Sequence, residues 1–278
     1  MESSVRSTYS AHLQTASLLG LPLIIKPHST LNERFGIHQS IALGEDEMPT
    51  VKYVTIGNGG HRMIVGADNI PKPEPILHTP RHAGLYNHLP FILRLPQNDL
   101  QPAERLQYRL RRSEVHDGTT YIAYYLKVLD LSNSNPTLEL RNVTDGVVTS
   151  TAFNPTAADL NPTPPPINPG SVITTSGDYI AATAKVPFVM TTEDILEFIN
   201  VCNIIYGDPN YAMITEIGLC SGVDRTVSGD FNGVSLGYTD AIAVQICSFI
   251  AAFYALNFTN DELSLLIDVG SLESLLIN

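Results

Sequence analysis

The segment from Glu104 to Phe153 shows the clearest alternation of apolar and polar positions in the chain. Large apolar residues alternate with glutamine and arginine from residue 106 to residue 111, which is the period of a strand with one buried face. Asp-Gly pairs at 117–118 and 145–146 favour tight hairpin turns, because both residue types tolerate positive φ. The segment therefore predicts a meander of four antiparallel strands, joined by two Asp-Gly hairpins and one looser turn.

Apolar and β-branched residues predict further strands on either side of this meander. Segments 50–56 and 61–67 flank Gly-Asn-Gly-Gly at 57–60, and this arrangement predicts another hairpin. The proline-rich stretch 71–102 predicts loop, with one short strand at 89–95. Strands are also expected at 178–184, 186–190 and 263–269.

One helix is marked by its two ends. Thr191 is a natural N-cap, and the acidic residues that follow it suit the positive end of the helix dipole. Four apolar residues between Ile195 and Cys202 share one face, and Gly207 ends the pattern. A second helix is expected within the first twenty residues.

The last third of the chain contains an unusually apolar run. Segment 213–224 predicts a strand that enters a loop at 228–238. Ala241–Phe258 then contains 18 residues without a charge, which borders on the length of a transmembrane helix. No lysine or arginine follows Arg225 to anchor such a helix, and polar residues interrupt the run. We therefore expect a fully buried strand or helix instead of a membrane span.

Six prolines interrupt the segment from Asn154 to Gly170. Proline has a fixed φ and no backbone N–H, so this segment can form neither a helix nor a central strand. An extended segment of this length reaches roughly 50 Å, which is farther than two touching domains require. Two interpretations stand: a solvated linker, or an arm that lies along a neighbouring subunit. The candidate interface residues of such an arm are Pro162, Pro164, Pro165 and Pro166.

This segment divides the expected fold, which is α+β and mostly β. We expect residues 1–153 to form a domain built on the antiparallel β-meander. Residues 154–170 are the proline-rich arm, and residues 171–278 form a smaller, acidic α+β domain.

Charge is distributed unevenly along the chain. The net charge is −12 and only 16% of the residues are charged, a low value that suits a surface covered by other protein. Residues 1–127 carry a net charge of +2, whereas residues 128–278 carry −14. The acidic half would repel nucleic acid and anionic membranes, and would suit a basic neighbour such as the first half of another copy. The three cysteines give no disulfide framework, which fits a reducing compartment, and we expect no export signal.

Histidines offer the strongest hint of chemistry. His78, His82 and His88 lie within eleven residues, so a zinc site is one interpretation. Their spacing matches no known zinc pattern, and loop histidines that hydrogen-bond to backbone are the favoured interpretation. The glycines at 57–60 lack the Lys-Ser or Lys-Thr of a phosphate-binding loop, and the chain has no Gly-x-Ser-x-Gly motif. We therefore predict no catalytic, cofactor-binding or metal-binding residue and no enzymatic activity.

Arg105, Arg109 and Arg111 share one face of the first strand of the predicted meander. A strip that binds nucleic acid is one interpretation. The favoured interpretation is a solvated or interface face, with nearby glutamates as partners. In its sharper form, the three arginines make an interface patch that receives an acidic neighbour.

Two segments carry a resemblance to known proteins. YAMITEIGLCSGVD, at Tyr211–Asp224, resembles the strand, Thr/Ser-Glu-Ile-Gly-Leu and turn of tailed-phage baseplate and tail-fibre attachment proteins. Gln107–Leu131 is similar in texture to β domains of baseplate wedge proteins. Glu216, Ile217 and Gly218 match the first segment, whose strand is structural in such proteins. The resemblance implies a non-enzymatic virion component, assembled in the host cytoplasm.

The resemblance also implies the partners. They are other virion proteins and copies of the same chain, in a homo-oligomer within a tail, baseplate, neck or collar, with no nucleic acid and no membrane. The alternative is a β-rich receptor- or glycan-binding module, in which Tyr121, Tyr124 and Tyr125 are candidates to stack on a sugar, although the chain has no tryptophan. A hydrolase is the third hypothesis.

Overall fold

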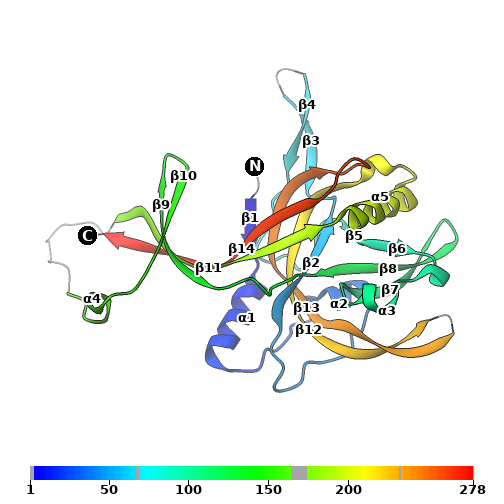
Figure 1. Cartoon of the computed structure of the whole chain (residues 1–278), viewed down its shortest axis with the longest axis horizontal. Helices are drawn as coiled ribbons and strands as arrows, with labels where there is room; N and C mark the ends of the chain where they lie inside the picture. The colour runs from blue at the N-terminus through cyan, green and yellow to red at the C-terminus, as the bar shows by residue number, and fades with distance from the viewer. Residues whose placement is uncertain (1–2, 67–68, 164–173, 232, 278) are drawn as a thin grey trace. The chain divides into compact units, whose positions relative to one another are not determined.

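Antiparallel strands dominate the computed structural model, which describes residues 3–66, 69–163, 174–231 and 233–277 (Figure 1). The strands are β1 (Ser3–Arg6), β2 (Thr50–Gly57), β3 (His61–Val65), β4 (Pro71–Pro75), β5 (His88–Leu89), β6 (Ile92–Arg94), β7 (Tyr108–His116), β8 (Thr119–Val128), β9 (Thr137–Thr144), β10 (Val147–Ala152), β11 (Thr174–Met190), β12 (Met213–Phe231), β13 (Val234–Ala255) and β14 (Leu263–Ile277). The helices are α1 (Thr8–Leu19), α2 (Leu31–Phe35), α3 (Pro102–Arg105), α4 (Ala157–Leu160) and α5 (Thr192–Tyr206), with short 3₁₀ turns at Pro96–Asn98 and Pro209–Tyr211. The expected α+β, mostly β fold is confirmed.

The chain folds into two compact units whose boundaries differ from those expected at residues 153 and 171. Unit 1 comprises Met1–Leu129 and Val189–Leu263, and unit 2 comprises Asp130–Phe188 and Ser264–Asn278. The difference arises because β12 pairs with β2, so most of the expected second domain returns to the first.

The sheet of unit 1 is organised around two long strands. Its order is β1-β13-β12-β2-β8-β6, with β5 paired to β2 and β7 paired to β8. β12 and β13 pair from Met213 opposite Ala255 to Phe231 opposite Val234. The expected loop at 228–238 is therefore wrong, because residues 228–231 and 234–238 extend the ladder of the hairpin.

The two Asp-Gly hairpins of the predicted meander are confirmed, but the meander itself is not. Asp117 and Gly118 have φ of 47° and 75°, and Asp145 and Gly146 have φ of 52° and 78°. The first pair joins β7 to β8 and the second joins β9 to β10. However, β8 pairs with β2 and β6, whereas β9 pairs with β11 in another sheet. The four strands are thus two hairpins in separate units.

The hairpin expected across residues 50–67 is also wrong. β2 pairs with β12, β5 and β8, while β3 pairs with β4 in a separate two-stranded ribbon. The glycines at the end of β2 and in the connection to β3 allow other backbone segments to approach closely, instead of forming a tight turn. A Cβ atom on Gly57 would lie 2.3 Å from the carbonyl oxygen of Asn87, and one on Gly60 would lie 2.7 Å from that of Thr215.

Helix α5 forms as its sequence predicts. The side chain of Thr191 accepts from the N–H of Asp194, Asp194 bonds back to Thr191, and Gly207 follows in the left-handed conformation at φ 71°. The four apolar residues expected on its inner face are buried, namely Ile195, Phe198, Ile199 and Cys202.

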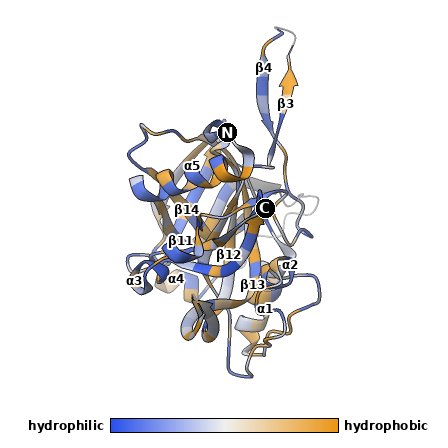
Figure 2. Cartoon of the chain, turned by 90° about the vertical axis from the view of Figure 1, so that its right-hand side faces the viewer, coloured by the Kyte–Doolittle hydropathy of each residue, from blue (hydrophilic) through white to orange (hydrophobic). Residues whose placement is uncertain are grey.

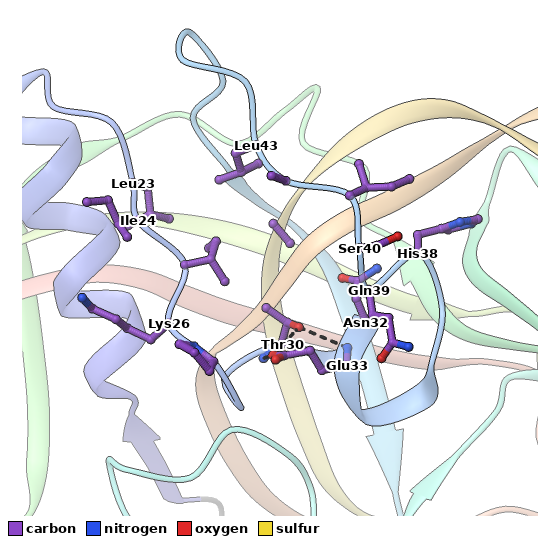
Figure 3. A pocket seen from close by; sticks show the side chains of 15 residues that line it. Leu23, Ile24, Lys26, Thr30, Asn32, Glu33, His38, Gln39, Ser40 and Leu43 are labelled. Atoms are coloured by element: carbon purple, nitrogen blue, oxygen red, sulfur yellow. Dashed lines mark hydrogen bonds between the residues drawn. The ribbon is translucent and has the colours of Figure 1, made fainter.

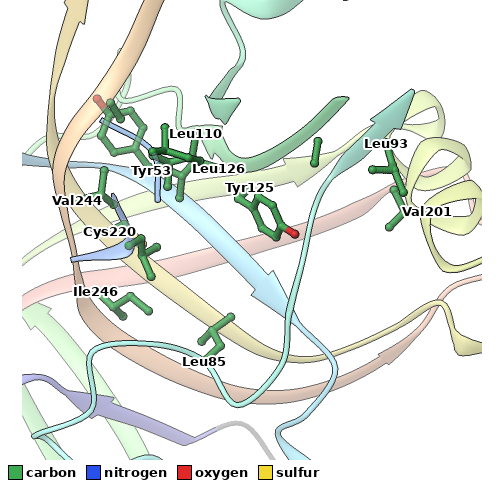
Figure 4. Packing of buried hydrophobic residues seen from close by; sticks show 14 of the residues in the cluster. Tyr53, Leu85, Leu93, Leu110, Tyr125, Leu126, Val201, Cys220, Val244 and Ile246 are labelled. Carbon is green, nitrogen blue, oxygen red and sulfur yellow. The ribbon is translucent and has the colours of Figure 1, made fainter. Parts of the chain in front are cut away.

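The main hydrophobic core of unit 1 lies between its strands and α5. Tyr53, Leu110, Leu126 and Ile246 are buried together there, and Val201 joins them from α5 (Figure 4). Most of the uncharged run at 241–258 is the strand β13, which confirms the expectation of a buried element. Among the described residues, no helix has the length and apolar content that crossing a membrane would require.

Unit 2 contains a four-stranded sheet in the order β10-β9-β11-β14. Its described buried apolar residues are few, with Ala181, Val186 and Phe188 on β11 and Ile267 on β14. This sheet therefore buries little of its own apolar surface.

Candidate functional site

Exposed large apolar residues occur at many described positions, including β3, the β9–β10 hairpin and the end of α1. On β3, Met63 and Val65 are 56% and 62% exposed, and the ribbon stands clear of the main sheet of unit 1 (Figure 2). In unit 2 the exposed apolar residues of β9 and β10 are Leu138, Leu140, Val143, Val147 and Val148. A third group lies at the end of α1 and in the loop after it, with Leu18, Leu19, Leu21 and Ile24. Exposed apolar side chains mark interaction surfaces where they gather into a patch.

Arg109, one of the expected interface residues, is buried within unit 1. It is 6% exposed, and its Nε donates to Asp224 Oδ1 at 2.7 Å. Asp224 also accepts from Lys52 Nζ at 3.1 Å and from Tyr53 Oη at 2.8 Å. Burial raises the pKa of Asp224, but the hydrogen bonds from Arg109 and Tyr53 outweigh it and leave the pKa below its ordinary value.

The other two arginines of the expected patch also bind within unit 1. Arg111 donates to Asp99 Oδ2 from Nε at 3.0 Å and from Nη2 at 2.8 Å. Arg105 donates to the carbonyl oxygen of Leu100 at 3.1 Å, and its guanidinium lies 4.1 Å from the centre of the Phe231 ring. Arg109 and Arg111 therefore cannot receive an acidic neighbour without breaking these contacts.

Acidic residues of the second half of the chain meet basic residues of the first half inside unit 1. Lys127 Nζ lies 2.6 Å from Asp194 Oδ2, and Arg94 Nη2 lies 2.6 Å from Glu197 Oε1. With the Arg109–Asp224 pair, these contacts balance part of the opposite charge of the two halves within one molecule. A second copy is not needed to neutralise them.

Only part of the proline-rich segment is described. Pro162 is exposed, whereas Pro164, Pro165 and Pro166 lie outside the described residues. Whether these prolines contact another subunit stays a prediction.

The three histidines of the segment 78–88 do not converge on one point. The side chain of His78 is almost fully buried, between the rings of Phe249 at 4.1 Å and Tyr86 at 4.3 Å. Its Nδ1 lies 3.0 Å from His82 Nδ1, and its Nε2 lies 2.9 Å from Glu216 Oε2. Among the described residues, no group of three or more histidine, cysteine or acidic side chains is placed to hold a metal.

His88 makes its hydrogen bonds away from His78 and His82. It matches the favoured interpretation, a loop histidine that hydrogen-bonds to backbone. Its Nε2 accepts the backbone N–H of Leu85 at 2.9 Å, so its Nδ1 carries the proton that is donated to Thr55 Oγ1 at 3.2 Å. Burial lowers the pKa of His88 well below its ordinary value, and the positive charge of Arg34 lowers it further.

Glu216 is the residue whose role the sequence did not reveal. Its carboxylate is 1% exposed and accepts the backbone N–H groups of Gly59, Tyr86 and Asn87 at 2.9–3.0 Å, besides its contact with His78. One side chain on β12 thus anchors two loops of the first half. The only signal in the sequence was an acidic residue within an apolar strand.

The tyrosines considered for sugar stacking are mostly inaccessible. Tyr124 and Tyr125 are buried, and their hydroxyls donate to Asp99 and Glu114. Their faces are therefore unavailable to a sugar ring, while Tyr121 is partly exposed.

A pocket of about 440 Å³ lies between the loops that follow α1 and α2 (Figure 3). Two of its polar residues bind elsewhere in the loops. Glu33 caps α2 by accepting the N–H of Thr30 at 3.2 Å, and Asn32 donates to the carbonyl oxygen of Ala241 at 2.9 Å. These groups hold loop backbone together and do not converge on the open space.

The fold and these surfaces define a mostly β protein built from antiparallel sheets in two units. Over residues 1–278 the chain matches a family of unknown function, DUF7208, and it belongs to that family. No curated protein and no solved structure matches it significantly.

Replacement of Glu216 by alanine should strongly destabilise the protein. The change leaves three backbone N–H groups and His78 without the buried carboxylate that they contact, so we expect the free energy of unfolding to fall by about 3–5 kcal/mol. Denaturant unfolding of Glu216→Ala and of Glu197→Ala measures this. Glu197 makes a partly exposed ion pair, and its loss should cost about 1 kcal/mol or less. Equal losses in the two variants would contradict the anchoring role of Glu216.

Acid should destabilise the protein through His88. Its pKa in the folded chain lies below the unfolded value of about 6.5, so the unfolded chain takes up the proton first as the pH falls. The free energy of unfolding should therefore decrease by about 1 kcal/mol between pH 6.5 and 5.5 through this group.

The measurement compares this decrease in the native chain, in His88→Gln and in His12→Gln. In His88→Gln the decrease in the free energy of unfolding should be smaller by about 1 kcal/mol. Replacement of the exposed His12 should leave the decrease unchanged. An unchanged decrease in His88→Gln would show that other groups cause it.

Proposed function

We propose that this chain is a non-enzymatic structural component of a tailed-phage virion. It is built into a tail or baseplate, or into a neck or collar, by contacts with other virion proteins and with copies of itself. The resemblance of Tyr211–Asp224 and Gln107–Leu131 to baseplate proteins suggests this class. The fold is compatible with it, since both segments are antiparallel strands.

The observation that carries the proposal is the exposure of apolar side chains on the β9–β10 hairpin and on the β3–β4 ribbon. Val147 and Val148 on β10 are 63% and 58% exposed, in a sheet that buries few apolar residues of its own. Met63 and Val65 on β3 are exposed to a similar degree. Burial of such residues against another protein would remove apolar surface from water, which is the dominant favourable term in protein association.

The internal ion pairs support the same proposal. Arg109, Arg111 and Lys127 are largely buried against carboxylates of unit 1, so they are not available as a nucleic-acid strip. Contacts with partners would depend instead on apolar side chains and strand edges.

The cysteines fit assembly in a reducing compartment. All three are free and buried, and burial raises the pKa of Cys202 to about 12. A thiol in this state is unreactive, because the thiolate is the reactive form.

The test is to look for the protein in purified virus particles and to compare its limited proteolysis there with that of the free protein. Leu160 is 84% exposed, so thermolysin should cut the free chain before this residue. A Leu160→Ser variant, which lacks the site, identifies the corresponding fragment. In assembled particles we expect the cut to be at least tenfold slower, because a partner covers the segment 154–170. Absence of the protein from purified particles would contradict the virion role, and equal cleavage in both samples would make the segment a plain linker.

A further inference from the structure

The β3–β4 ribbon forms a sheet of its own. β3 pairs with β4 in a two-stranded sheet, with His61 opposite Pro75, Met63 opposite Pro73 and Val65 opposite Pro71. A two-stranded ribbon is marginally stable in water without further strands or a packed face. Its outer edges and its faces therefore decide what it can bind.

The outer edge of β4 cannot donate hydrogen bonds. The N–H of Ile76 donates to the carbonyl oxygen of Gly60 at 2.8 Å, so the even-numbered residues of β4 direct their N–H groups toward β3. The outward positions are therefore those of Pro71, Pro73 and Pro75, which have no N–H. Proline at these positions prevents another strand from pairing with β4.

The outer edge of β3 is open to pairing. The same alternation directs the N–H and C=O groups of His61, Met63 and Val65 away from β4. These three side chains share one face of the ribbon with the prolines, whereas Arg62 and Glu74 lie on the other face and pair at 2.6 Å. On this face the ring of His61 packs against Phe253 of β13, with ring centroids 5.4 Å apart, whereas Met63 and Val65 are exposed. The open edge therefore carries an exposed apolar face formed by Met63 and Val65.

We propose that β3 pairs in antiparallel fashion with β3 of a second copy, about a two-fold axis at Met63. Residue 61 then lies opposite Val65 of the partner subunit, and Arg62 lies opposite Ile64 of the partner subunit. No like charges face each other, so the strand is complementary to itself in this register. This inference deepens the proposed function. It rests on that function in one respect only, because both require contacts between copies of the chain.

The proline pattern limits the assembly to two copies at this site. Pairing gives a four-stranded sheet in the order β4-β3-β3-β4, in which both outer edges consist of proline-blocked strands. The pairing adds hydrogen bonds at three residues of each strand and brings the two Met63 side chains together. The contact is small, so dimer formation depends on protein concentration in the free state.

Cysteine cross-linking of the purified full chain tests the register. In Met63→Cys the two new thiols would sit directly opposite each other, with Cα atoms about 5.5 Å apart. In Val65→Cys, at a similarly exposed site on the same face, the two Cα atoms would be about 14 Å apart, from four residues at the rise of a strand and the spacing between the two strands. The native cysteines are buried and serve as an internal background.

With a short bis-thiol cross-linker, we expect the covalent dimer to form at least tenfold faster in Met63→Cys than in Val65→Cys. Sedimentation should show a concentration-dependent dimer of the native chain, which Met63→Pro abolishes. That proline removes only an outward N–H, so the bonds between β3 and β4 remain. Equal cross-linking rates, or a native chain that stays monomeric at all concentrations, would overturn the proposal. Both assays use purified protein, so their failure is distinct from absence of the chain from virions.

Discussion

The return of β12 alongside β2 is the constraint on which unit 1 depends. This pairing sets Glu216 opposite Gly57, and it links the β12–β13 hairpin through β2 to the β7–β8 hairpin. Closing so long a loop costs conformational entropy before any contact forms. Side chains of β12 contribute beyond the ladder: Glu216 anchors two loops near one end, and Asp224 binds Lys52 on β2 and Arg109 on β7. The acidic residues of the second half thus help to fasten it to the first.

Buried polar side chains also fix irregular backbone in this sheet. Leu110 is fully buried and has a φ of 54°, a conformation that costs a non-glycine residue about 1 kcal/mol or more. Its N–H donates to Asp240 Oδ1 at 2.6 Å, which holds this backbone conformation within β7. Asn32 plays a similar part at β13, where it accepts the N–H of Val244 at 2.8 Å beside Ala243, whose φ is 53°. Each arrangement requires a side chain that is remote in the sequence.

Local signals in the sequence predicted the elements whose ends depend on neighbouring residues. The turn at Asp117-Gly118 and the helix between Thr191 and Gly207 formed as expected, because caps and tight turns are decided within a few residues. Strand partners were not predictable, since β8 and β9 have suitable patterns to pair with each other but join different sheets. Arg109 was expected on an interface face but is buried, and the reason is the same. Asp224 can contact it only because β12 pairs with β2. Glu216 lies in the segment that resembles baseplate proteins, but nothing local indicated the N–H groups that surround it.

The distribution of charge and proline determines which surfaces are left for recognition. Carboxylates such as Glu216 and Asp224 already have their partners inside unit 1, and Glu33, which lines the pocket, caps α2. The projecting β3–β4 ribbon has the opposite character, with an apolar face and one open edge. Proline closes its other edge, so strand pairing can proceed from β3 alone. Recognition by backbone pairing and apolar burial is the mode expected of a part that is built into a larger assembly.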